Sequence, residues 1–179
     1  MVDELKADLD DALGAKKSEP PKPNPAKIRL HNRMFEISRM NLQLFDLEPI
    51  VSFAEALIDG PCHVIHNNSF QTPPGGGITG WHQDDPPHMV VTHGEPPTNI
   101  RLPVLLFTAN YYLTDVDRVE NGPTQTVPGS HLSGKSPPNP FEGTEYENRV
   151  VSNLGPAGSV IMFNNQVWHR RMKATARVT

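Results

Sequence analysis

The sequence after Gly60 consists of short apolar runs separated by turn residues. The interruptions are rich in glycine, proline and asparagine, and they lie at residues 73–77, 86–87, 121–123, 128–129 and 155–158. Strands that recur at such short intervals, without long helices between them, are typical of a β-sandwich or β-barrel. We therefore expect a mainly β body, built from antiparallel strands, from about residue 62 to the end of the sequence.

Two segments carry the strongest strand patterns. Residues 105–114 alternate, with one face formed by Leu105, Phe107, Ala109, Tyr111 and Leu113. The other face carries Asn110 and Tyr112, which point either into the barrel or to solvent. A second strand is expected at residues 159–163, directly after a turn of sequence Gly-Pro-Ala-Gly.

The N-terminal part of the sequence has a different character. Leu5, Leu9 and Leu13 are spaced by four, which predicts a helix over residues 2–13 that ends at Gly14. Residues 16–27 contain four prolines and no large apolar residue, so we expect a linker. We therefore divide the chain into a helix and proline-rich linker at 1–27 and a folded body at 28–179. A second helix is expected at residues 48–58, closed by Asp59 and Gly60.

Length and charge limit the possible functions. A chain of 179 residues suits one domain with a substantial core. The net charge is −4, with 16 basic and 20 acidic residues, so a nucleic-acid partner is not expected. The N-terminus has no signal-peptide core, and no apolar run approaches the ~18 residues of a membrane span. We expect a cytoplasmic protein without a membrane partner; the oligomeric state is open.

The single cysteine restricts the metal chemistry. Cys62 alone excludes an internal disulfide and a four-thiolate zinc site, and its apolar neighbours predict a buried, inert thiol. The eight histidines are the more promising ligands.

One short motif has the composition of a metal site. In the run Trp81-His82-Gln83-Asp84, His82 and Asp84 are two residues apart, so in extended chain their side chains point the same way. An imidazole nitrogen and a carboxylate oxygen suit iron, manganese or zinc. The alternative interpretation is that this short motif forms a surface turn and binds no metal.

A third ligand is available on a later strand. His169 ends the run 160–169, and two histidines with one carboxylate on one side of a metal leave neighbouring positions open. Non-haem iron oxygenases use this arrangement to bind a co-substrate and O₂, whereas a structural zinc site fills its coordination sphere.

Four motifs together resemble the phytanoyl-CoA dioxygenase family. They are the Trp-His-Gln-Asp run at 81–84, Asn-Gly-Pro-Thr-Gln-Thr-Val-Pro-Gly-Ser-His at 121–131, Pro-Ala-Gly-Ser-Val-Ile-Met-Phe at 156–163, and Trp-His at 168–169. The resemblance extends in order and spacing from residue 62 to residue 169. It implies a double-stranded β-helix (a jelly roll, cupin-like) in which His82, Asp84 and His169 bind Fe(II). It also implies 2-oxoglutarate as co-substrate, with O₂ and a small molecule as the other reactants.

The family also requires an arginine that pairs with the far carboxylate of 2-oxoglutarate, because a guanidinium binds a carboxylate through two parallel hydrogen bonds. Arg170 and Arg171 lie too close to His169 to belong to a following strand, so Arg177 is the nearest candidate. The resemblance further suggests Asn67 and Gln83 as residues near the co-substrate or the metal.

The sequence predicts an Fe(II)- and 2-oxoglutarate-dependent dioxygenase that hydroxylates a C–H bond and releases succinate and CO₂. The chain ends at Thr179, where the resemblance leads us to expect one or more further core strands. Two alternatives are therefore kept. One is an inactive or truncated jelly roll that binds metal or another protein; the other is a cupin-type metalloenzyme that does not use 2-oxoglutarate.

Overall fold

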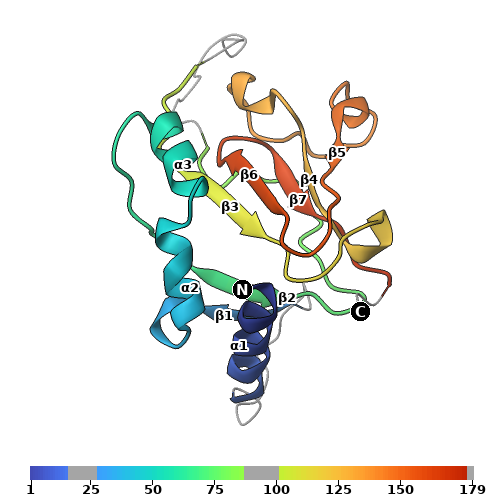
Figure 1. Cartoon of the computed structure of the whole chain (residues 1–179). Coiled ribbons are helices and arrows are strands. Elements are labelled where there is room, and N and C mark those ends of the chain that lie inside the picture. The colour runs from blue at the N-terminus through green and yellow to red at the C-terminus, as the bar shows by residue number, and fades with distance from the viewer. Residues whose placement is uncertain (16–27, 87–100, 177–179) are drawn as a thin grey trace.

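The computed structural model describes residues 1–15, 28–86 and 101–176 (Figure 1). The α-helices are α1 (Val2–Ala15), α2 (Arg39–Gln43) and α3 (Ile50–Ile58). The strands are β1 (Arg29–Asn32), β2 (Asn68–Gln71), β3 (Phe107–Tyr111), β4 (Thr124–Thr126), β5 (Val151–Ser152), β6 (Val160–Asn164) and β7 (His169–Arg171). Short 3-10 helices are η2 (Met34–Glu36), η3 (Leu44–Asp46), η4 (Val119–Asn121), η5 (Ser130–Leu132) and η6 (Glu147–Arg149).

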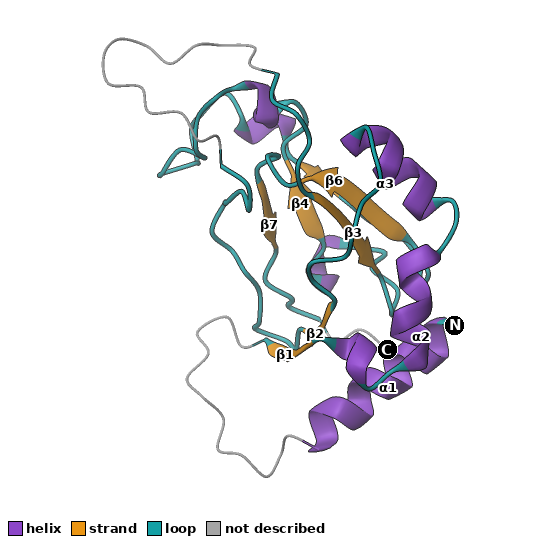
Figure 2. Cartoon of the chain, turned by 90° about the vertical axis from the view of Figure 1, so that its left-hand side faces the viewer, coloured by secondary structure: helices purple, strands orange, loops and turns teal. Residues whose placement is uncertain are grey.

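The β body is built from two facing sheets. Strand β3 pairs with β6, and β4 lies between β5 and β7; every one of these pairings is antiparallel. The rings of Phe163 on β6 and His169 on β7 lie 4.7 Å apart, so the two sheets enclose a common interior. Figure 2 shows the β3–β6 layer beside the β4–β7 layer. The architecture is a jelly roll, as predicted, and a small β1–β2 sheet lies next to α1 and α2 (Figure 1).

The alternation predicted for the clearest strand is present in β3. Phe107 faces outward, because its ring lies 6.1 Å from that of Phe53 on α3. The opposite face is directed inward: Thr108 Oγ1 donates a hydrogen bond to Asn165 Oδ1, and Tyr112 is buried. The paired part of the strand is shorter than the expected range 105–114, since β6 offers five residues as partners.

Helix α1 packs against the rest of the chain through its leucines. Leu5, Leu9 and Leu13 are all buried, and Leu9 and Leu13 form a cluster with Met34 and the partly buried Leu113. The helix continues to Ala15, so the expected end at Gly14 is wrong. A helical glycine costs about 1 kcal/mol relative to alanine, which the burial of one neighbouring leucine offsets. The division of the chain at residue 28 stays a prediction.

The second predicted helix is α3, and its end has the expected chemistry. Asp59 adopts the left-handed conformation with φ 63°, and the Gly60 N–H donates to the Glu55 carbonyl. By contrast, Cys62 is exposed, so the prediction of a buried thiol is wrong. The residues around it are exposed as well, because 61–66 is an extended segment at the surface. Among the described residues, no helix is both long and apolar enough to cross a membrane.

A single hydroxyl joins α1 to α2. Ser38 caps α2 and is 3% exposed; its Oγ accepts hydrogen bonds from the backbone N and the Nδ2 of Asn41, each at 3.0 Å. The same hydroxyl donates to Asp8 Oδ2 of α1 at 2.5 Å. Both the capping bond and the link to α1 therefore depend on this one oxygen atom.

We predict that Ser38→Ala lowers the free energy of unfolding by about 2–3 kcal/mol, because it removes a buried helix cap and leaves the partly buried Asp8 carboxylate without its donor. Urea denaturation monitored by circular dichroism measures the change. The control is Ser52→Ala, which removes an exposed bond to Glu48 and is expected to cost less than about 0.5 kcal/mol. Equal losses in the two variants would contradict the role given to Ser38.

Candidate metal centre

Two Trp-His pairs, far apart in the sequence, are joined by backbone hydrogen bonds. The His82 N–H donates to the His169 carbonyl at 3.0 Å, and the His169 N–H donates to the His82 carbonyl at 2.9 Å. This antiparallel bridge places the 82–84 segment beside β7. The two imidazole ring centroids are consequently 4.3 Å apart.

Each imidazole has one nitrogen fixed by a backbone carbonyl. His82 Nδ1 lies 2.9 Å from the Gly80 carbonyl oxygen, and His169 Nδ1 lies 2.8 Å from the Val167 carbonyl oxygen. Because a carbonyl oxygen only accepts, Nδ1 carries the proton in each ring and Nε2 retains its lone pair. Metal-binding histidines are commonly oriented in this way.

Asp84 supplies a carboxylate next to both Nε2 atoms. Its Oδ1 lies 3.9 Å from His82 Nε2, and its Oδ2 lies 3.4 Å from His169 Nε2. The backbone N–H groups of Asp84 and Asp85 both donate to the Asn165 carbonyl, which fixes this turn. One ligand atom from each of His82, Asp84 and His169 lies within 4.8 Å of the other two.

The charges at this site favour a cation. When the neighbouring histidines are protonated, a side-chain hydrogen bond with His169 is the main cause that holds the pKa of the Asp84 carboxyl below its usual value. Partial burial opposes this shift, whereas the charges of the protonated His169, His82 and His66 add to it. The side chain of His169 is 8% exposed and that of Asp84 is 49% exposed, so the site is open to solvent on one side. Two imidazole nitrogens and one carboxylate oxygen fit Fe(II).

The tryptophans that precede the two histidines point the opposite way, into an outer aromatic cluster. Trp168 is buried with Val127 and Phe141, and Trp81 stacks on Phe141 with ring centroids 4.4 Å apart. The Ser130 hydroxyl accepts a hydrogen bond from the Trp168 backbone N–H at 2.8 Å. The 121–131 motif therefore holds the strand that carries His169.

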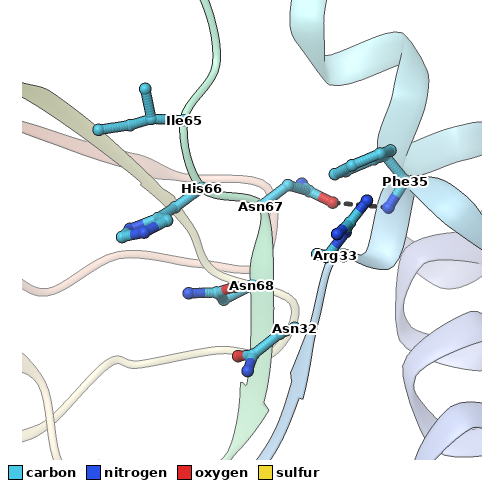
Figure 3. Close-up of a pocket in the computed structure, with 7 residues that line it drawn as sticks. All are labelled: Asn32, Arg33, Phe35, Ile65, His66, Asn67 and Asn68. Carbon is cyan, nitrogen blue, oxygen red and sulfur yellow. Dashed lines mark hydrogen bonds between the residues drawn. The ribbon is translucent and has the colours of Figure 1, made fainter.

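The sequence also predicted co-substrate contacts for Asn67, Gln83 and Arg177. Asn67 lines a pocket of about 260 Å³, where its Oδ1 accepts from the Phe35 N–H and its Nδ2 donates to Asn41 (Figure 3). Both polar atoms of the Gln83 side chain are buried without a hydrogen-bond partner among the described residues. Arg177 lies outside the described residues. The co-substrate role of all three stays a prediction.

The sequence analysis gave no role to the exposed His66, and it set Arg171 aside as a co-substrate residue. His66 points to the opposite side of its segment from Asn67 (Figure 3), and its charge lowers the pKa of Asp84. No signal in the sequence connected His66 with Asp84. Arg171 lies on β7, two residues after His169 and on the same face.

The sequence and the fold both match known proteins. A family model described as phytanoyl-CoA dioxygenase matches residues 2–171. No curated protein matches the chain in sequence. HygX from Streptomyces hygroscopicus, solved with nickel, 2-oxoglutarate and hygromycin B, has a TM-score of 0.64 and 14% identity over 94% of this chain and 73% of its own. SnoK, a non-haem α-ketoglutarate-dependent carbocyclase from nogalamycin biosynthesis, has a TM-score of 0.69 and 19% identity, covering 98% and 69% of the two chains.

These similarities identify the protein family and the class of enzyme. At such low identities the two solved structures establish the jelly-roll fold, while the family model covers nearly the whole chain. The chain belongs to the phytanoyl-CoA dioxygenase family. Its class is accordingly that of the non-haem iron dioxygenases that use 2-oxoglutarate.

Close backbone packing next to the site gives a test of its geometry. Gly77 approaches the residues directly after β7 so closely that an added Cβ would lie 2.7 Å from the Met172 carbonyl oxygen. We predict that Gly77→Ala displaces the segment leading to His82 and weakens Fe(II) binding at least about 10-fold, as expected when ligand orientation is lost. Anaerobic calorimetric titration with Fe(II) measures the affinity.

The matched control is Gly80→Ala, in the same segment. A Cβ at Gly80 has no atom within 4 Å, and the change retains the carbonyl that orients His82. We expect the affinity of this variant for Fe(II) to stay within about twofold of the original. A similar loss in both variants would show that the approach of Gly77 to β7 does not position the ligands.

Proposed function

We propose that the protein hydroxylates a C–H bond of a small organic or acyl substrate, with His82, Asp84 and His169 binding the iron. The observation that carries the proposal is the convergence of one ligand atom from each of these three residues within 4.8 Å. Bound Fe(II), with 2-oxoglutarate and O₂, supplies the oxidising power and yields succinate and CO₂ with the hydroxylated product. The reaction would take place in the cytoplasm.

The contribution of the chain is orientation and charge. The carbonyls of Gly80 and Val167 fix the two rings, so that both lone pairs are available to the cation. Asp84 brings one negative charge against the two charges of a divalent ion, and the remaining positive charge favours an anionic oxo acid. Three ligands on one side leave the other positions open to reactants.

A cavity beside the site suits a small organic substrate. It has a volume of about 430 Å³, in the range typical of small-molecule sites, and it is lined mainly by apolar groups. Thr126, which pairs with His169 in the sheet, and Phe163, whose ring contacts His169, both line it. The apolar ring of Phe163 also shields His169 from water.

The test is anaerobic addition of Fe(II) and 2-oxoglutarate, followed by the weak visible charge-transfer band of the chelate. We expect a band with the unaltered protein and its loss, with Fe(II) affinity reduced at least about 100-fold, in His82→Ala and in His169→Ala. The control is His63→Ala, an exposed histidine outside the triad, which should retain the band.

Other outcomes point to the alternative functions. Tight metal binding without a band on adding 2-oxoglutarate would indicate a cupin-type metalloenzyme that does not use this co-substrate. Failure to bind metal at all would indicate a jelly roll with an interaction role. An undiminished band in His82→Ala would remove that residue from the site.

A further inference from the structure

The side chains of the cavity beside the metal centre present more hydrogen-bond donors than acceptors. Asn164 Oδ1 already accepts a hydrogen bond from the Gln166 N–H at 2.6 Å, so the free group of this side chain is its NH₂. Thr126 Oγ1 accepts from Asn153 Nδ2 at 3.3 Å, which leaves the hydroxyl proton of Thr126 available to donate. The carbonyl oxygen of Asn153 is the acceptor that remains. A molecule bound in the cavity therefore meets mainly donors.

His131 adds a further donor to this cavity. Its Nδ1 is buried without a hydrogen-bond partner among the described residues, while the residue itself lines the cavity. Burial also lowers the pKa of His131, so the ring is neutral at pH 7 and carries one proton. A buried N–H without an acceptor is rarer in proteins than a buried acceptor without a donor, which places this proton on Nε2. His131 therefore donates through Nε2 and keeps a lone pair on the buried Nδ1.

The rest of the lining is apolar and carries no formal charge. None of the described residues that line the cavity is an aspartate, glutamate, lysine or arginine. Apolar side chains cover most of it, among them Leu57 of α3 and Ile161 and Phe163 of β6. An ammonium group would find no carboxylate there and a carboxylate would find no cation, so each would lose its hydration without a counter-charge. A neutral hydrogen-bond acceptor on an apolar body fits all of these groups.

We propose that this cavity binds a neutral carbonyl compound with a mainly apolar body, and that His131 Nε2 donates a hydrogen bond to its carbonyl oxygen. The assignment rests on the proposed function, because it names the substrate class of that same site. Thr126 pairs with His169 in the sheet, and the Phe163 ring lies 4.7 Å from the His169 ring. A compound held in the cavity therefore lies next to the metal centre, and its apolar body provides the C–H bond.

The backbone around His131 is fixed by its neighbours. His131 is the middle residue of η5, where the Leu132 N–H donates to the Gly129 carbonyl at 3.1 Å. Gly129 itself has φ 79°, in the left-handed region that favours glycine. The Ser130 hydroxyl accepts from the Trp168 N–H at 2.8 Å. Because these bonds are already made, binding of a ligand by the His131 ring does not require this segment to become ordered.

The test measures the binding of two ring compounds of similar shape to the full chain by NMR titration, with no iron added. Cyclohexanone carries a carbonyl group, and methylenecyclohexane carries a carbon–carbon double bond in its place. His131→Leu should weaken the binding of cyclohexanone about 3- to 10-fold, the loss expected for one neutral hydrogen bond. The binding of methylenecyclohexane should stay within about twofold. His131→Gln, which keeps an N–H donor, should recover part of the loss.

The ¹⁵N resonances of the His131 ring give a second measure. Cyclohexanone should shift the Nε2 resonance further than methylenecyclohexane does, because that nitrogen donates to the carbonyl oxygen. The control is His63→Leu, which changes an exposed histidine outside the cavity and should leave the binding of both compounds unaltered.

Three results overturn the proposal. They are failure of both compounds to bind, an Nε2 resonance that responds equally to the two, and equal weakening of both in His131→Leu, which is the result of a structural role. Absence of the charge-transfer band in the unaltered protein, with cyclohexanone still bound through His131, refutes the proposed function instead. The two failures are therefore distinguishable.

Discussion

The antiparallel bridge between His82 and His169 is the interaction on which the site depends. Two backbone hydrogen bonds bring together segments that are separated by most of the β body, and they do so at the two residues that would bind the metal. Because these backbone hydrogen bonds set the register, they bring the two imidazole rings to within 4.3 Å of each other. Asp84 is placed next to the two histidines because its backbone N–H donates a hydrogen bond to the Asn165 carbonyl.

The alternation of side chains along each strand separates the residues that pack in the outer cluster from the residues that face the candidate metal centre. Each histidine is preceded by a tryptophan, and each tryptophan turns to the outer aromatic cluster while its histidine turns inward. The outer side chains provide packing and the inner ones provide chemistry. Arg170 and Arg171 repeat this alternation one step further along β7: Arg170 bonds to Gln125 on the outside, and Arg171 has its Nε buried on the inner side.

The sequence predicted those features that depend on local pattern. Turn residues predicted the β body, the leucine spacing predicted α1, and the i, i+2 rule joined His82 to Asp84. It did not predict α2, which is held by the Ser38 hydroxyl through a contact with Asp8 in another helix. Nor could it place His66 near Asp84, because that proximity arises from the packing of separate segments.

The outer cluster has a consequence for how such a protein can diverge. Trp168 Nε1 donates to the carbonyl of Lys135, and Tyr146 packs edge-on against the Trp168 ring, so surface segments more than twenty residues away support the strand that carries His169. Substitutions in those segments would alter the position of His169 without contacting it. These segments therefore offer positions at which the orientation of His169 can be changed without altering the side chains that face it.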